Sequence, residues 1–76
     1  MIKTTQKELK RHVAVGIAQD VTQFSLDEAN ALHQAHRLET VAVSRGVNGL
    51  NGALLEDENG KLYAITARNT TLAQLV

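Results

Sequence analysis

Two Asn-Gly dipeptides, Asn48-Gly49 and Asn59-Gly60, lie between apolar segments in the second half of the chain. Both residues of such a pair accept the positive φ of a type I′ turn, so each pair predicts a two-residue hairpin loop. The segment before the first pair alternates in polarity, with Val41 and Val43 on one side. The second half of the chain is therefore predicted to form a three-stranded antiparallel meander.

Two-residue loops would determine which residues face each other in this meander. Val43 would then lie opposite Leu54, and Leu54 opposite Ile65, so that branched side chains cross one face of the sheet. We expect helices to pack on that face. A further dipeptide, Asn51-Gly52, offers a competing turn, so the register of the first hairpin stays open.

Capping-box spacings predict two helices before the sheet. Thr5 precedes Glu8, and Ser25 precedes Glu28, at the spacing in which hydroxyl and carboxylate each satisfy a backbone N–H at a helix start. The apolar stripe of the first helix is predicted to include Leu9, Val13, Gly16 and Ile17. The second helix is predicted from Leu26 to about Arg37. Residues 20–24 are predicted to connect the helices, with Val21 and Phe24 turned inward.

The length of 76 residues and the 43% hydrophobic content suit a single core, so residues 1–76 are expected to form one domain. The expected fold class is α+β, with two N-terminal helices followed by the meander. Leu72, Leu75 and Val76 recur at helical spacing, which predicts a short C-terminal helical turn after Thr70 or Thr71.

The predicted register leaves the reverse face of the sheet apolar, which predicts a partner-binding surface. The residues expected to form it are Ala42, Leu55, Leu62 and Ala64. The C-terminal tail, a second copy of the chain or a different protein could cover this face, because contiguous exposed apolar surface marks interfaces. A short edge strand would also permit sheet extension by a partner. We therefore expect a non-catalytic protein-interaction module, acting through this face or edge on a second copy of the chain or on another protein. Arg45 and Arg68 are strand residues that could anchor an acidic partner.

A nucleic-acid-binding module is the alternative hypothesis, because half of the basic residues lie near the N-terminus. They are Lys3, Lys7, Lys10 and Arg11. Against it, the formal net charge is zero, aromatic residues make up only 3% of the chain, and the second helix has no basic residue before Arg37.

His33 and His36 stand three residues apart, where a helix would place both rings on one face for a metal ion, with Glu39 or His12 as a third donor. Such a pair arises easily by chance, so we expect surface histidines and neither a metal site nor a cofactor. No nucleophile elbow or phosphate-binding glycine loop is present, so an enzyme is not expected. Tyr63 is predicted to pair with Glu56, because a buried phenol needs a hydrogen-bond partner.

The chain has neither cysteine nor an apolar run long enough to span a bilayer, and its N-terminal residues do not form a secretory signal. We therefore expect a cytoplasmic protein without a membrane partner. The segment from Gly60 to Asn69 resembles the closing hairpin of short proteins encoded in phages and other mobile elements. This resemblance implies an accessory role and no particular site residue.

Overall fold

The computed structural model describes residues 2–46 and 50–68, which form two helices and a five-stranded mixed sheet. The elements in chain order are β1 (Ile2–Lys3), α1 (Gln6–Ala14), β2 (Ala18–Asp20), α2 (Leu26–Ala35), β3 (Glu39–Arg45), β4 (Leu50–Glu56) and β5 (Leu62–Arg68). The predicted α+β class is confirmed, but the predicted order of two helices and then a meander is wrong, because strands are interleaved with the helices. No helix in the described part of the chain is long and apolar enough to cross a membrane.

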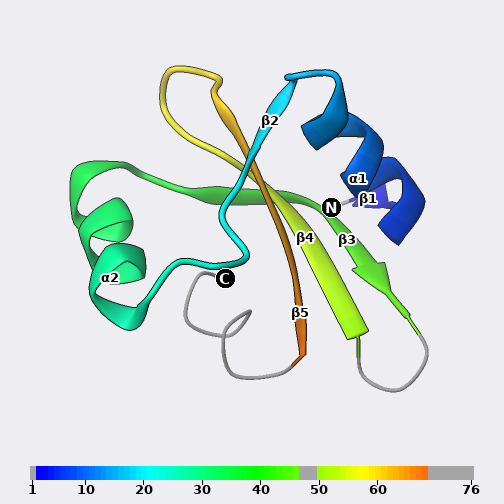
Figure 1. Cartoon of the computed structure of the whole chain (residues 1–76). Helices are drawn as coiled ribbons and strands as arrows, with labels where there is room; N and C mark the ends of the chain where they lie inside the picture. The colour runs from blue at the N-terminus through cyan, green and yellow to red at the C-terminus, as the bar shows by residue number, and fades with distance from the viewer. Residues whose placement is uncertain (1, 47–49, 69–76) are drawn as a thin grey trace.

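The antiparallel meander of β3, β4 and β5 forms the centre of the sheet, as predicted (Figure 1). β1 adds to it in parallel beside β3, and β2 adds in parallel beside β5, which gives the strand order β1-β3-β4-β5-β2. Neither outer strand was predicted, because segments of two and three residues are too short to show alternation. In the chain, α1 connects β1 to β2, and α2 connects β2 to β3.

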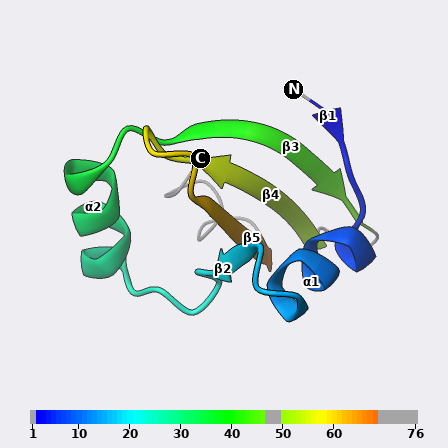
Figure 2. The same ribbon diagram turned by 90° about the horizontal axis from the view of Figure 1, so that it is seen from above.

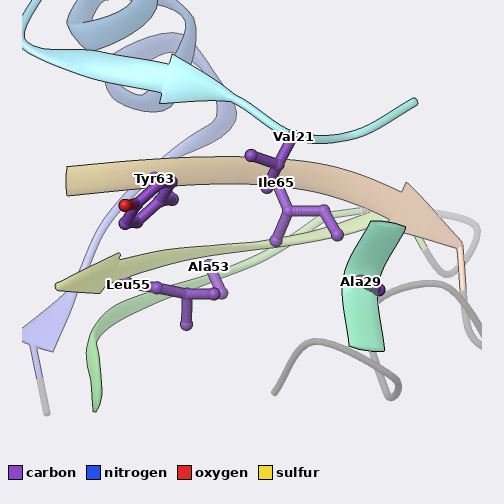
Figure 3. Close-up of a cluster of buried hydrophobic side chains, with 6 residues drawn as sticks. All are labelled: Val21, Ala29, Ala53, Leu55, Tyr63 and Ile65. Carbon is purple, nitrogen blue, oxygen red and sulfur yellow. The ribbon is translucent and has the colours of Figure 1, made fainter. Parts of the chain in front are cut away.

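The two helices lie on opposite sides of the sheet, as Figure 2 shows. On one side α1 covers a cluster made of Leu9, Ala18, Ala42, Leu54 and Ala64. On the other side, beside α2, lies a cluster made of Val21, Ala29, Ala53, Leu55, Tyr63 and Ile65 (Figure 3). Consecutive residues of β4 therefore belong to different clusters. Phe24 packs against the cluster beside α2, which confirms its predicted inward position.

The predicted strand register is wrong by one residue in both hairpins. Val43 lies opposite Ala53 rather than Leu54, and Leu54 lies opposite Ala64 rather than Ile65. In the first hairpin the register also shifts between Thr40 and Ala42, an irregularity that period-two reasoning does not anticipate. The competing Asn51-Gly52 turn is ruled out, because both residues lie within β4.

A longer loop explains the error in the second hairpin. The Gly60 amide donates to the Asp57 carbonyl, and the Asp57 amide donates to the Lys61 carbonyl. Residues 58–60 therefore form the loop, as a turn followed by Gly60 at a φ of 83°. This is the pattern of a three-residue hairpin with a glycine bulge, rather than of a two-residue type I′ turn.

The observed register and the additional strands place the residues of the predicted partner-binding surface differently from the prediction. Ala42 and Ala64 lie beneath α1, with Leu62 packed at the margin of the same cluster, whereas Leu55 lies in the cluster on the opposite face. These four residues therefore do not share a face, and both apolar faces are packed against elements of the chain itself. The predicted turn at Asn48-Gly49, the C-terminal turn from Thr70 to Val76 and the side chain of Arg68 lie outside the described residues.

Both helix starts follow the predicted capping. The Glu8 amide donates to Thr5 Oγ1 at 3.2 Å, and Ser25 and Glu28 form the complete capping box. The first helix ends earlier than its apolar stripe suggested, since Gly16 has a φ of 80°. Gly16 donates to Val13 and Ile17 to His12, the bond pair of a Schellman motif, so this glycine terminates α1 instead of lying inside it.

Gly52 allows α1 to approach the middle of β4. A Cβ at this position would overlap Leu9 Cδ1 and would stand 3.1 Å from the Ile65 carbonyl oxygen. Leu9 is almost fully buried, so its side chain has little room to move aside. Glycine is therefore required here for close packing, although it is unfavourable in a strand interior.

Gly52→Ala is expected to lower the free energy of unfolding by about 1–3 kcal/mol, the usual range for overpacking a core. In a Leu9→Ala background the same change should cost less, because the vacated space accepts the methyl group. Urea denaturation of the two single variants and the double variant measures this coupling. Additive effects would show that Leu9 and Gly52 are not in contact.

Candidate functional site

Polar side chains gather where the β4–β5 hairpin meets the end of α2. His36 is the C-cap of α2, Asp57 directly precedes the hairpin loop, Glu58 is its first residue, and Tyr63 lies in β5. Asp57 is only 6% exposed and Tyr63 2%, while the side chains of His36 and Glu58 reach solvent. A buried carboxylate needs hydrogen-bond or charged partners, because burying a charge without them is unfavourable.

The Asp57 carboxylate has a hydrogen-bond donor on each oxygen. Oδ1 accepts from the backbone amides of Asn59 at 2.8 Å and Lys61 at 2.9 Å. Oδ2 accepts from the Tyr63 hydroxyl at 2.8 Å. Tyr63 therefore has the carboxylate partner that burial demands, but this partner is Asp57 and not the predicted Glu56, because the one-residue shift places Glu56 opposite Leu62.

His36 connects α2 to the hairpin. Its Nδ1 lies 2.8 Å from Glu58 Oε1 and 3.8 Å from Asp57 Oδ2. The backbone amide of Arg37 donates to the second Glu58 oxygen at 3.1 Å. The helix end and the loop are thus held together by one histidine, one backbone amide and one glutamate.

The hydrogen bonds set the ionisation of this cluster. Burial raises the pKa of Tyr63 to about 12, and its hydrogen bond to Asp57 and the negative charges of Asp57 and Glu58 act in the same direction. Burial alone would raise the pKa of Asp57, yet hydrogen bonds from Tyr63, Lys61 and Asn59, with the charge of His36, hold it below its ordinary value. The hydrogen bond with His36 is the main cause of a lowered pKa of Glu58.

The pKa shifts give these groups defined protonation states at neutral pH. Tyr63 stays protonated at neutral pH and serves as a donor, while both carboxylates are ionised acceptors. The ligand atoms of His36, Asp57 and Glu58 lie within 4.8 Å of one another, so these three residues could hold a metal ion. The predicted His33–His36 pair is not formed on one helical face, because His36 has extended backbone angles beyond the end of α2.

A second feature lies at the other end of β3, on the sheet face opposite α1. Lys3, Thr4, Val43 and Arg45 line a hollow of about 220 Å³. Both cationic side chains are exposed, and no acidic residue lines the hollow in the described part of the chain. A smaller groove of about 90 Å³ between α1 and β5 has room for only a few water molecules.

The predicted nucleic-acid-binding residues do not form one surface. Lys7, Lys10 and Arg11 lie on the exposed side of α1, whereas Lys3 belongs to β1 and lines the hollow on the opposite sheet face. Arg11 is also paired with Glu8 at 3.0 Å. The prediction grouped these four residues by their closeness in sequence, but β1 and α1 place Lys3 apart from the other three.

Sequence reasoning missed Asp57 and Glu58 as site residues. The signal was present in Asp57-Glu58-Asn59-Gly60, since aspartate is favoured at the first position of a type I turn and glycine at the fourth. The Asn59-Gly60 pair within these residues favoured the prediction of a two-residue loop. The approach of His36 to the same loop depends on tertiary packing and leaves no local signal.

No protein-family model, curated protein or solved structure matches the chain.

Tyr63 is the single tyrosine of the chain, so phenolate absorbance follows its ionisation directly. The folded protein should titrate near pH 12, against about 10 in denaturant, and folding stability should therefore fall as pH rises from 10 to 12. Asp57→Asn should lower the midpoint, because it removes the negative charge beside the phenol. Circular dichroism of the same samples separates ionisation from unfolding. A folded-state midpoint near 10 would contradict the buried hydrogen bond.

The carboxylates predict the opposite behaviour in acid. The pKa values of Asp57 and Glu58 lie below 3.8 and 4.5, so their contribution to stability is present above these values and lost as pH falls through the folded-state values. Urea unfolding between pH 7 and pH 3 should show this loss, and Asp57→Asn should make the curve flatter. An unchanged pH dependence in the variant would contradict the assignment.

Proposed function

We propose that the protein is a non-catalytic interaction module that binds an extended segment of another protein along the β1–β3 edge of the sheet. Support comes from the lengths of the two strands. β3 runs from Glu39 to Arg45, but β1 pairs with it only at Ala42 and Val43. In the described part of the chain, strand pairing on this side leaves the first residues of β3 open, and an open edge accepts a further strand.

The charges beside this edge indicate an acidic partner. Lys3 and Arg45 flank the hollow, with Val43 between them as an apolar surface. Among the described residues, the basic side chains in ion pairs are Arg11 and His36. Lys3 and Arg45 therefore have no acidic partner in the described part of the chain. A carboxylate placed between them would gain charge-assisted hydrogen bonds, which arginine forms with favourable geometry. The partner segment is therefore one that carries carboxylates at the end seated in the hollow.

A protein segment suits this surface better than a nucleic acid. The hollow offers two cations, which would neutralise about two phosphates, while nucleic-acid affinity grows with the number of neutralised phosphates. The remaining basic residues of the N-terminal group lie on α1, on the other side of the sheet. A strand-like peptide paired with the open start of β3 would continue past β1 toward the hollow, where its carboxylates would meet the two cations.

A labelled decapeptide of alternating Thr and Val that ends in two Glu residues is a suitable probe. We expect it to bind in a fluorescence anisotropy titration, and a matched peptide ending in two Lys residues to bind at least tenfold more weakly. Lys3→Gln with Arg45→Gln should weaken binding of the acidic peptide by about tenfold or more. Lys7→Gln with Lys10→Gln removes the same charge from α1 and is the control, which should bind like the wild type.

Equal binding of both peptides, or equal loss in both double variants, would refute the edge as the binding surface. Sedimentation of the free protein tests whether a second copy of the chain binds at this edge instead. A dimer that Lys3→Gln with Arg45→Gln dissociates would show that the edge pairs with itself. Salt-dependent binding of duplex DNA that is lost in the α1 variant would favour the nucleic-acid alternative instead.

A further inference from the structure

We infer that His36, Asp57 and Glu58 form a binding site for a divalent transition-metal ion, for which Zn²⁺ is the best match. We do not rest this site on the proposed function, because its donors are His36, Asp57 and Glu58, whereas the hollow is lined by other residues. Glu39, the first residue of β3, pairs with Glu56 beside the hairpin loop, whereas Arg45 pairs with Asn51 at the far end.

The geometry of the donor atoms carries the inference. One ligand atom from each of His36, Asp57 and Glu58 lies within 4.8 Å of the others, and His36 Nδ1 is 2.8 Å from Glu58 Oε1 and 3.8 Å from Asp57 Oδ2. Ligand atoms that stand about 2.0–2.2 Å from a tetrahedral zinc ion are separated by about 3.4 Å. The two His36 separations of 2.8 Å and 3.8 Å lie on either side of this value, so small side-chain movements would bring the donors to coordination distance.

The carboxylates are already held in position by groups outside the donor set. Asp57 Oδ1 is fixed by the amides of Asn59 and Lys61, which leaves Oδ2 directed toward His36 and Tyr63. Glu58 is fixed by the Arg37 amide through its other oxygen. Outer hydrogen bonds of this kind orient metal ligands and reduce the cost of assembling a site. A carboxylate oxygen has room for both a hydrogen bond from Tyr63 and a metal ion.

The chemistry of the donors selects the ion. One imidazole nitrogen with two carboxylate oxygens matches zinc and similar divalent ions, and the two negative charges balance the charge of the ion. His36 would bind as the neutral tautomer that carries its proton on Nε2, in place of its present contact with Glu58. The side chains of His36 and Glu58 are 32% and 44% exposed, so a fourth position would face water.

Without a metal ion, the same three side chains would serve as an ion-paired link between α2 and the hairpin. The two alternatives differ in what added zinc does. A simple ion pair gains nothing from zinc, whereas a metal site is stabilised by mass action, because the ion binds the folded state. His33 provides a matched control, since it is an exposed histidine on the same helix and lies outside the donor set.

The experiment compares thermal unfolding of metal-free protein with EDTA and with excess zinc chloride. Zinc should raise the Tm of the wild type and of His33→Gln by about 5 °C or more, and should not raise the Tm of His36→Gln or Glu58→Gln. Each variant is compared with its own EDTA baseline, so that loss of the ion pair does not obscure the result. Cobalt(II) added to the wild type should give the intense visible absorption of a tetrahedral site, and His36→Gln should abolish it.

The absence of a Tm increase together with the absence of the cobalt spectrum would overturn the site. An increase that persists in His36→Gln, or one that disappears in His12→Gln or His33→Gln, would place the metal elsewhere and would equally overturn it.

Discussion

The buried Asp57 carboxylate is the interaction on which the arrangement of this small protein depends. It accepts hydrogen bonds from the amides of Asn59 and Lys61 and from the hydroxyl of Tyr63. These donors lie in the loop, just before β5 and within β5, so one side chain determines the loop length. The loop length in turn sets the β4–β5 register, because a shift of one residue moves every side chain to the other face.

That register explains why the sheet needs a helix on each side. Leu54 packs beneath α1 and Leu55 lies in the cluster beside α2, so β4 is apolar on both faces. The chain covers both faces by crossing from β1 to β2 through α1 and returning to β3 through α2. Gly52 lets the first crossing pack closely against β4. The outer strands β1 and β2 are short, and β1 therefore leaves part of the β3 edge open.

The ends of β3 carry opposite chemistry as a result. At its start lie the hairpin carboxylates, drawn toward His36 at the end of α2. At its end Lys3 and Arg45 flank a hollow without acidic residues in its described lining. Cation binding at one end and carboxylate binding at the other are therefore separate proposals.

Local signals predicted the parts of the fold that local chemistry determines. The capping residues Thr5 and Ser25 marked both helix starts, and the Asn-Gly pairs indicated three antiparallel strands. Strands β1 and β2 could not be predicted, because their pairing partners lie far away in sequence and the segments themselves show no alternation.

The site was harder to predict for a related reason. Tyr63 was expected to need a carboxylate, which is correct, but its partner depends on a one-residue difference in loop length. His36 was grouped with His33 by helical spacing, yet α2 ends at Ala35 and the ring turns toward residues 57 and 58. Only the packing of α2 beside the hairpin brings these groups together.

Interstrand nuclear Overhauser contacts in the labelled protein would report which residues of β4 and β5 face each other, and therefore the length of the hairpin loop that Asp57 holds. We expect direct cross-strand contacts of Leu54 with Ala64 and of Leu55 with Tyr63, with the Asp57 amide close to Lys61. Leu54 facing Ile65, with Glu58 facing Lys61, would show a two-residue loop. It would contradict the role assigned to Asp57 and, with it, the arrangement of both helices.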